Sequence, residues 1–429
     1  MKVKILDVIM GGGKTTAMIN YINSYVGDEK FIFVTPYLTE VERIIDACPN
    51  KEFYQPLPKP SKLYNLKNLL KGNNNIAMCH ALLYYLDQEV INMIKDKNYI
   101  LIMDEVVDVV VPYEKKKAIE KKEGITRSDI NCILKNYGHL DPKTHLIVWE
   151  KDSYDGGLNK YKQMCKLGCI ALYGSNQDPL WLFPADVFTA FKDVYIMTYM
   201  FDAQIQKYYY DLKGIKYEYL FVDINSDGDY FISKDPPKSK LKDYYSLINI
   251  CEREKLNYNK NKKYDFSKSW YKINQNNNII VQLKNNVGNY FRNICKASSN
   301  ECLWTTFKDY KDKIKGKGYA KGYVSCNLRA TNEFRDRKYF AYLINRYMNP
   351  VVKNFFIQNN IHVDEDKYAL SGLLQCMWRT RIRDDKPINV FIPSSRMREL
   401  LECWIDENSP KIAKQEKNHT IDTPTLSIV

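Results

Sequence analysis

The stretch DVIMGGGKTTAMINYI, residues 7–22, places three glycines directly before Lys14 and Thr15. An apolar run of strand length precedes the glycines, and apolar residues recur at helical spacing after Lys14. A strand, a glycine loop and a helix in this order are typical of a phosphate-binding loop, because backbone amides can approach phosphate oxygens where no Cβ intervenes. The residues expected to bind nucleotide phosphates are Gly11, Gly12, Gly13, Lys14, Thr15 and Thr16.

Within this loop the side chains have separate expected roles. Lys14 would reach the β and γ phosphates, and the Thr15 hydroxyl would bind Mg²⁺. The general pattern has a further glycine at position 8, where this chain has Val8. We expect the loop to form regardless, with Gly11 making the turn.

Composition limits the class of protein. The 429 residues are 45% hydrophobic, which is enough for two or three domains with cores of their own. Eleven cysteines occur without a CxxC pair, and no run of about 18 apolar residues is present, so we expect reduced thiols, no membrane span and a cytoplasmic location. The net charge of +13 favours a polyanionic partner.

Apolar runs alternate with helical patterns through the first half of the chain. Each run is short and is separated from the next by a stretch with helical spacing. Buried strands joined by helices predict a parallel α/β sheet, in which ligands collect at the carboxyl ends of the strands. After the first strand, the predicted strands are residues 31–37, 75–80, 99–110, 194–201 and 217–223, and residues 115–192 are expected to be mixed and mainly helical.

A polar, basic and turn-rich stretch at residues 224–275 interrupts this pattern and is interpreted as an insertion or linker. A second α/β run follows it. Its predicted strands are residues 278–283, 301–307, 321–327 and 388–393. The predicted organisation is therefore a first lobe at 1–223, the insertion at 224–275, a second lobe at 276–408 and a disordered tail at 409–429.

Asp104 and Glu105 directly follow the apolar residues 100–103. A P-loop ATPase needs two carboxylates at such a strand end, one to hold Mg²⁺ and one to polarise the attacking water. We therefore expect Asp104 to hold the metal together with Thr15, and Glu105 to be catalytic. An ordinary acidic turn after a buried strand would have the same sequence pattern, but the upstream glycine loop favours the catalytic interpretation.

The stretch GLLQCMWRTRIRDDKPINVFIPS, residues 372–394, carries a cluster of arginines. On one helix, Gln375, Arg379 and Arg383 would fall within roughly 80° of a single face, and Arg381 would point elsewhere. Guanidinium groups match phosphate oxygens and neutralise charge in a phosphoryl-transfer transition state. The alternative is a solvated basic face.

The order of six motifs resembles the superfamily-two helicases of the DEAD/DEAH-like group, in particular those of phages and prophages. The motifs are MGGGKTT (10–16), TPYL (35–38), CHALL (79–83), DEVV (104–107), MTYMF (197–201) and QCMWRTRIR (375–383). The resemblance extends from residue 5 to about residue 405 and is weakest at 110–190 and 224–275. It implies two RecA-like P-loop lobes, with ATP and Mg²⁺ bound in the cleft and nucleic acid running across both.

The resemblance also implies roles for individual residues. Thr198 would couple hydrolysis to movement along the strand, and Gln375, Arg379 and Arg383 would belong to the arginine-finger helix. Two positions depart from the family pattern: Trp378 replaces a glycine, and the second arginine is displaced by one residue. The residues implied to contact nucleic acid are Thr35, His80, Arg329, Thr331 and Asn332.

The leading hypothesis is a nucleic-acid-stimulated ATPase that translocates on or unwinds DNA in phage or mobile-element replication. Its expected partners are single-stranded or branched DNA and replication proteins, in the bacterial host cytoplasm. Two alternatives stay open. One is a DNA-packaging motor or switch ATPase, although the second half has no cluster of acidic residues suited to a nuclease. The other is a nucleoside-kinase-like enzyme, which would have no use for a second α/β lobe.

Overall fold

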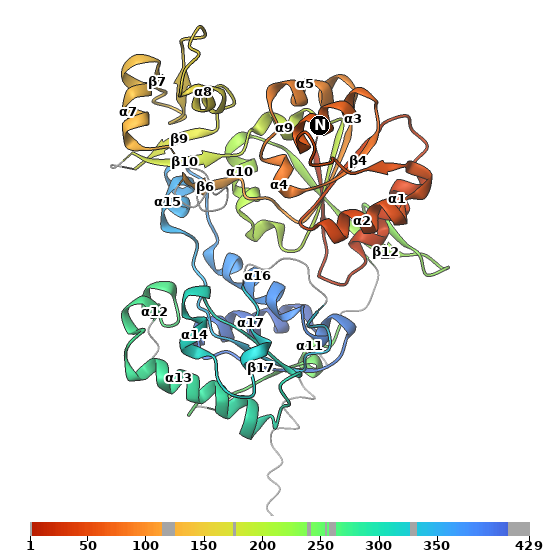
Figure 1. Cartoon of the computed structure of the whole chain (residues 1–429). Coiled ribbons are helices and arrows are strands. Elements are labelled where there is room, and N and C mark those ends of the chain that lie inside the picture. Colours follow the sequence, from red (N-terminus) through yellow and green to blue (C-terminus); the bar gives the residue numbers. More distant parts are fainter. Residues whose placement is uncertain are drawn as a thin grey trace, which may run out of the picture. The chain divides into compact units, whose positions relative to one another are not determined.

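The computed structural model describes residues 2–113, 125–174, 177–237, 242–253, 255–256, 263–326 and 333–410. The chain divides into two compact units. Unit 1 comprises Met1–Pro237 and Asn349–Val363, and unit 2 comprises Lys238–Met348 and Asp364–Val429 (Figure 1). The predicted insertion at 224–275 is thus divided between the units, and a short segment within the predicted second lobe belongs to unit 1.

Among the described residues of unit 1, eight strands form one sheet in the order β13-β12-β1-β11-β5-β2-β4-β3. All neighbouring strands are parallel except β13, which is antiparallel to β12. The carboxyl ends of the parallel strands therefore lie at one edge. The strands are β1 (Val3–Asp7), β2 (Phe31–Thr35), β3 (Phe53–Tyr54), β4 (Asn75–Cys79), β5 (Ile100–Asp104), β11 (Asp193–Thr198), β12 (Tyr217–Ile224) and β13 (Tyr230–Ser233).

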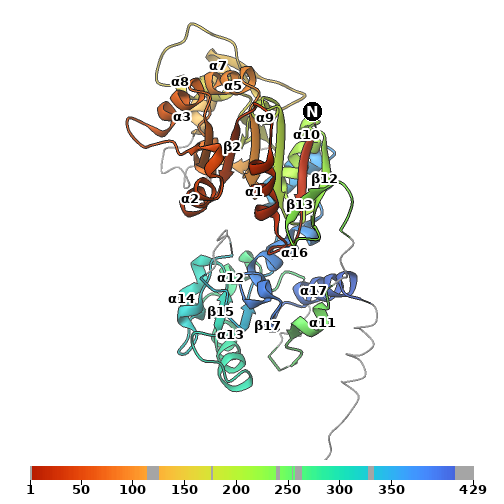
Figure 2. The same ribbon diagram turned by 90° about the vertical axis from the view of Figure 1, so that its right-hand side faces the viewer.

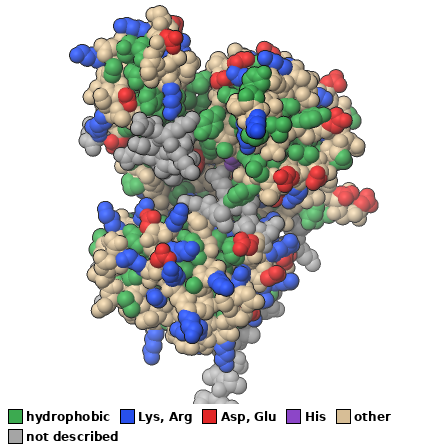
Figure 3. Space-filling model, in the orientation of Figure 1, with side chains coloured by type: hydrophobic (Ala, Val, Ile, Leu, Met, Phe, Trp, Pro, Cys, Tyr) green, Lys and Arg blue, Asp and Glu red, His purple; other side chains and the backbone are tan. Residues whose placement is uncertain are grey.

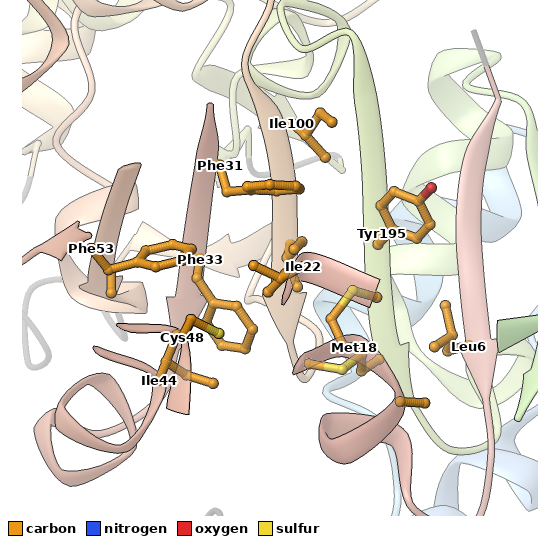
Figure 4. Close-up of a cluster of buried hydrophobic side chains, with 14 of the residues drawn as sticks. Leu6, Met18, Ile22, Phe31, Phe33, Ile44, Cys48, Phe53, Ile100 and Tyr195 are labelled. Atoms are coloured by element: carbon orange, nitrogen blue, oxygen red, sulfur yellow. The ribbon is translucent and has the colours of Figure 1, made fainter. Parts of the chain in front are cut away.

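Side chains at every second position of the strands form a hydrophobic core on one face of this sheet. Ile100 and Ile102 of β5 join a buried cluster with Met18 and Ile22 of α1 and Ile44 of α2 (Figure 4). Side chains at odd and even positions point to opposite faces, so continuous apolar strands are buried on both. The flanking helices are α1 (Lys14–Ser24), α2 (Leu38–Ala47), α3 (Lys62–Lys71), α4 (His80–Leu83), α5 (Gln88–Asp96), α9 (Ala185–Thr189) and α10 (Ile205–Lys213).

The chain between β5 and β11 forms a smaller substructure of unit 1. Strands β6, β10 and β9 make an antiparallel sheet, and β7 and β8 form a hairpin. The segment at 115–192 is mixed in its described part, as expected, but it is not predominantly helical, since strands alternate with helices there. The elements are β6 (Val110–Pro112), α7 (Arg127–Asn136), β7 (Gly138–Leu140), β8 (Ile147–Trp149), α8 (Asn159–Lys166), β9 (Ile170–Tyr173) and β10 (Asp178–Leu182).

Helix α15 (Pro350–Gln358) packs against this substructure, although it follows unit 2 residues in the chain. The Tyr173 hydroxyl donates a hydrogen bond to the Asn354 carbonyl at 2.7 Å. The rings of Tyr173 and Phe355 meet edge to face, with centroids 5.7 Å apart. A helix predicted to belong to the second lobe is in this way anchored in the first.

Unit 2 contains a parallel sheet of four described strands in the order β14-β17-β16-β15. Helices α12, α13 and α14 lie on one side of it and α16 and α17 on the other (Figure 2). The strands are β14 (Ile248–Ile250), β15 (Cys302–Thr305), β16 (Tyr339–Tyr342) and β17 (Ile388–Phe391). The helices are α11 (Tyr244–Leu247), α12 (Lys268–Asn274), α13 (Asn278–Asn289), α14 (Lys311–Ile314), α16 (Glu365–Met377) and α17 (Ser395–Asn408).

Two predicted strands of the second half are wrong. Residues 278–283 lie in α13, where Ile280, Leu283 and Val287 are buried at helical spacing and Val281 is exposed. The described part of 321–327 makes a single bridge, between Tyr323 and Trp304, rather than a strand. The strand beside β15 is instead β16, in a stretch that was expected to be helical.

The fold class predicted from the sequence is confirmed: both units are α/β, with mostly parallel sheets flanked by helices. Within the described residues, no helix is both long and apolar enough to cross a membrane.

Candidate nucleotide-binding site

The glycine loop joins β1 to α1, as predicted. Gly13 is the N-cap of α1 at a φ of 79°, and Gly11 has a φ of 83°, a region that favours glycine. A Cβ on Gly12 would lie 2.5 Å from Cγ1 of Val8, and one on Gly13 would collide with the ring of Tyr230. Backbone conformation and close packing thus require glycine here, and Val8 is accommodated because Gly12 has no side chain.

Lys14 begins α1 and folds back over the loop. Its Nζ donates hydrogen bonds to the carbonyl oxygens of Val8, at 2.5 Å, and Ile9, at 3.2 Å. The first amides of any helix have no partner within that helix, and the helix dipole adds partial positive charge at the same end. The loop therefore offers an ammonium group and helix amides to an anion at one place.

Asp104 and Glu105 lie at the carboxyl end of β5, in the same sheet as β1. Burial is the main cause that raises the pKa of Asp104, to about 7; the Glu105 carboxylate raises it further, and Lys14 opposes the shift. Glu105 has a φ of 68°, and its amide donates to the Met197 carbonyl at 2.9 Å. The backbone therefore turns directly after Asp104, at Glu105.

The structure brings two other predicted residues to Asp104. The Thr35 hydroxyl, at the end of β2, lies 3.5 Å from Oδ2 of Asp104. Nε2 of His80, at the start of α4, lies 2.8 Å from the Asp104 carbonyl oxygen. Both side chains are buried, so they position the acidic strand end, and their contact with nucleic acid stays a prediction.

Thr198 lies at the end of β11, in register with Asp7 of β1. Its carbonyl accepts a hydrogen bond from the Val8 amide at 3.0 Å, which links it to the glycine loop. Its hydroxyl is buried and has no hydrogen-bond partner among the described residues. This position, between the loop and the acidic strand, suits a residue that senses what is bound there.

Sequence reasoning missed Asp7 and Tyr230. The Asp7 carboxylate accepts hydrogen bonds from the amides of Met200, at 2.7 Å, and Phe201, at 2.8 Å, and burial raises its pKa. An acidic residue ending the first strand was a visible signal for it. Tyr230 was assigned to the insertion, and nothing in the sequence indicates that it packs against Gly13.

The arginine segment in unit 2 differs from its prediction. Helix α16 ends at Met377, whose carbonyl accepts hydrogen bonds from the Thr380 amide, at 3.0 Å, and hydroxyl, at 2.7 Å. Thr380 is extended, and Arg381–Asp384 form a separate 3-10 helix. The expectation that Gln375, Arg379 and Arg383 share one helix face is therefore wrong.

The individual side chains of that segment have different surroundings. Gln375 lies in the last turn of α16 and is half-buried. Arg379 is buried, and its Nη1 donates to the Ser325 carbonyl at 3.3 Å, whereas Nε of Arg381 donates to the Pro387 carbonyl at 2.6 Å. Three predicted nucleic-acid contacts lie outside the described residues, namely Arg329, Thr331 and Asn332.

Comparison with known proteins identifies relatives of the whole chain. The SPbeta prophage-derived protein YonV of Bacillus subtilis (strain 168) is 39% identical over 422 residues, which cover 94% of this chain and 99% of that protein. The chain belongs to the YonV family. In addition, the family model described as "YonV C-terminal Rossmann-like domain" matches residues 242–405, which include most of unit 2.

Solved structures place the YonV family among known folds. Xpd4 of S. tokodaii matches with a TM-score of 0.50 at 12% identity, covering 96% of this chain and 95% of that one. A structure titled XPD helicase matches with a TM-score of 0.44 at 10% identity, covering 94% and 95% of the two chains. The likeness to Xpd4 supports two RecA-like lobes in this YonV relative, and the narrower DEAD/DEAH-like assignment stays a prediction.

The residues of this YonV-family site fit a magnesium nucleotide. The glycine positions form a cradle that a Cβ at Gly12 or Gly13 would obstruct, and Lys14 lies beside it. A hydroxyl from Thr15 and a carboxylate from Asp104 are the oxygen ligands that Mg²⁺ prefers. The site therefore has a group for each part of a triphosphate and its metal.

Proposed function

We propose that this protein is an ATP-dependent nucleic-acid translocase or helicase that acts on DNA in phage or mobile-element replication. One observation carries the proposal. Lys14 follows the glycine loop after β1 and Asp104 ends β5, and β11 pairs in parallel with both strands, so the two residues lie at the carboxyl edge of one sheet. This edge is where open α/β sheets bind their ligands.

Each residue has a defined part in the proposed activity. Lys14 binds the β and γ phosphates, and the helix amides of the loop bind phosphate oxygens. Thr15 and Asp104 would hold Mg²⁺, which when bound neutralises charge on the phosphates. Glu105 polarises the attacking water, and Thr198 links this site to strand β11.

The comparisons support the proposal at the level of the fold and the source. The fold resembles that of Xpd4, and a relative over nearly the whole length is derived from a prophage. Because that relative is derived from a prophage, we also propose replication proteins as partners. The proposed nucleic-acid contacts are Thr35, His80, Arg329, Thr331 and Asn332.

In unit 2, Arg379 is the proposed arginine finger, because its guanidinium would stabilise charge on the transferring phosphoryl group. Arg383 is proposed as a second finger and Gln375 as a polar contact to the same nucleotide. Because these three residues do not share one helix face, the role of each has to be tested separately.

The test is ATP hydrolysis by the full chain with and without single-stranded DNA. We expect strong stimulation by DNA, loss of hydrolysis in Lys14→Ala, and retained ATP binding without turnover in Glu105→Gln, since that variant loses only water activation. Stimulation by nucleosides instead of DNA would support a kinase. Hydrolysis at the parental rate in Glu105→Gln would show that the acidic pair is misassigned.

A strand-displacement assay separates a helicase from an ATPase that only translocates or switches. Duplexes with a 3′ or a 5′ single-stranded tail should be unwound in an ATP-dependent manner, and the preferred tail gives the polarity. If DNA stimulates hydrolysis but no strand is displaced from either duplex, the protein translocates or switches without unwinding.

A further inference from the structure

Unit 2 contains two arginines, the half-buried Arg346 and the buried Arg379, that have no carboxylate partner in the described part of the chain. Arg346 follows β16; its Nη2 donates to the Tyr368 hydroxyl at 3.2 Å, and its guanidinium lies 4.6 Å from the centre of that ring. Arg379 donates to the Ser325 carbonyl and to the Cys376 sulfur. Neither group is neutralised by these contacts.

Both guanidiniums lie against helix α16, at positions one turn apart: a Cβ on Gly372 would collide with Nη1 of Arg346, and Nη1 of Arg379 donates to the Cys376 sulfur at 3.4 Å. Burial raises the pKa of the Cys326 thiol, the Cys376 thiol raises it further, and both Arg346 and Arg379 lower it. Both positive charges therefore act on the same thiol. Helix α16 closes over Arg346 so tightly that a Cβ on Gly372 would collide with the guanidinium.

Two buried hydroxyls without partners lie at the same edge of the sheet. Thr305 and Tyr342 are register partners at the carboxyl ends of β15 and β16. Both side chains are fully buried, and neither hydroxyl has a hydrogen-bond partner among the described residues. Ala341 belongs to the core on the α13 face, so Thr305 and Tyr342 point toward the opposite face, where α16 lies.

This combination is costly unless an anion is present. A guanidinium stays protonated in a protein, and an enclosed charge without a counter-ion loses hydration that nothing replaces. Two such charges also repel one another, and hydroxyls can each donate a hydrogen bond. Two guanidiniums and two hydroxyl donors match the oxygens of a phosphate group.

We propose that Arg346, together with Arg379, Tyr342 and Thr305, binds a phosphate group at the carboxyl edge of the unit 2 sheet. The source of the phosphate, a nucleotide or the nucleic-acid backbone, rests on the proposed function. The anion site itself does not depend on hydrolysis, so the two proposals fail in different ways.

The first test is thermal unfolding of the full chain in inorganic phosphate and in chloride at equal ionic strength. Phosphate should raise the melting temperature of the wild type, and Arg346→Met should lose most of that gain. In chloride the variant should melt at the same or a higher temperature, because an unpaired charge has been removed. Arg337→Met, which removes a guanidinium bonded to the Ser299 carbonyl, should keep the full phosphate response.

An equal phosphate response in wild type and Arg346→Met would overturn the proposal. If Arg346→Met does not fold, Arg346→Lys serves in its place, since it keeps the charge and loses the two-pronged geometry. That variant should require on the order of 10-fold more phosphate for the same stabilisation.

The second test distinguishes the sources. Binding of a fluorescent non-hydrolysable ATP analogue and of a single-stranded oligonucleotide is measured for wild type and Arg346→Lys. A loss on the order of 10-fold in one of the two affinities identifies the source, and unchanged affinity in both overturns the proposal. If the wild type hydrolyses no ATP, the proposed function fails, while the phosphate response of Arg346 still decides the anion site.

Discussion

At the scale of single residues, the acidic pair that ends β5 shows how neighbouring carboxylates come to differ. Asp104 contacts Thr35 and lies near Lys14, in a buried position that raises its pKa to about 7. Glu105 follows at a φ of 68°, and its charge raises the pKa of Asp104 further. A carboxyl with a pKa of about 7 is partly protonated near neutral pH while no metal is bound to it.

The pH dependence of stability tests this arrangement. A carboxyl with a raised pKa contributes stability that is fully present below its ordinary pKa of 3.8 and is lost as the pH rises through about 7. Asp104→Asn removes the titration. Measured without Mg²⁺ by urea unfolding, the free energy of unfolding of wild type relative to Asp104→Asn should fall between about pH 5 and about pH 8 by on the order of 1 kcal/mol.

The matched control for this experiment is Asp46→Asn, which removes an exposed carboxylate from α2. The difference in free energy of unfolding between wild type and this variant, measured over the same range, gives the baseline for removing a carboxylate. Parallel stability curves for wild type and Asp104→Asn would show that the Asp104 pKa is not raised.

At the scale of elements, the point where α16 ends determines where the arginines that follow it lie. The helix stops at Met377, whose carbonyl accepts hydrogen bonds from Thr380, and the Arg379 and Arg381 side chains beyond it have different partners. Arg379 turns inward to Ser325, whereas Arg381 is bonded to Pro387 in its own loop. Of these arginines, Arg379 is the one that we propose as the arginine finger.

Basal ATP hydrolysis at saturating ATP tests this selection in three single variants. Arg379→Ala should lose hydrolysis by on the order of 10³-fold and keep most of its nucleotide affinity, the size typical of a missing arginine finger. Arg383→Ala should lose less, and Arg381→Ala should stay near the parental rate. Similar small effects at all three positions would indicate a solvated basic face.

Helix α15 is the second element whose role depends on packing. Phe355 and Phe356 are buried, and the Phe356 ring lies 5.7 Å from that of Tyr208 in α10. Ile357, on the same helix, is 48% exposed. The helix is thus anchored to unit 1 by one apolar face, while its flanking residues continue into unit 2.

Truncation of the two faces should have different consequences. Phe356→Ala should destabilise unit 1 by about 3–5 kcal/mol, the range for a large aromatic removed from a core, whereas Ile357→Ala should be nearly neutral. Chemical denaturation gives the loss, and hydrogen exchange should locate it at α15, β6 and α10. Equal effects of the two variants would mean that α15 is not anchored through this face.

At the scale of the whole molecule, charge is the property that bears on the partner. The chain has a net charge of +13, and Lys and Arg side chains are spread over the visible face of unit 2 (Figure 3). Six lysines and two aspartates fall within residues 308–321. A positive surface of this kind attracts polyanions without reading their sequence.

Salt should therefore weaken nucleic-acid binding steeply. Between about 50 and about 200 mM salt we expect at least tenfold loss of affinity for single-stranded DNA, linear on a logarithmic plot, because cations displaced from the backbone return to it. Oligonucleotides of different sequence but equal length serve as controls and should bind alike. Affinity insensitive to salt, or strongly dependent on sequence, contradicts a backbone-binding translocase.

Local sequence alone determined the parts that depend on neighbouring residues. The strand, glycine loop and helix at residues 3–24 follow from apolar spacing and from glycines with positive φ. The same holds for the buried strand that ends at Asp104 and for the α/β class, because short apolar runs between helices can only be buried in a parallel sheet. These features were predictable because their physical cause lies within a few residues.

Only the tertiary structure decided the contacts between distant segments. Sheet register brings Thr35 and His80 to Asp104, packing places Tyr230 against Gly13, and α15 returns to unit 1. The end of α16 and the pairing of Arg346 with Tyr368 likewise depend on what surrounds them. The spacing of residues along the chain cannot indicate such contacts. The burial of a residue and its contact partner depend on side chains from distant parts of the chain.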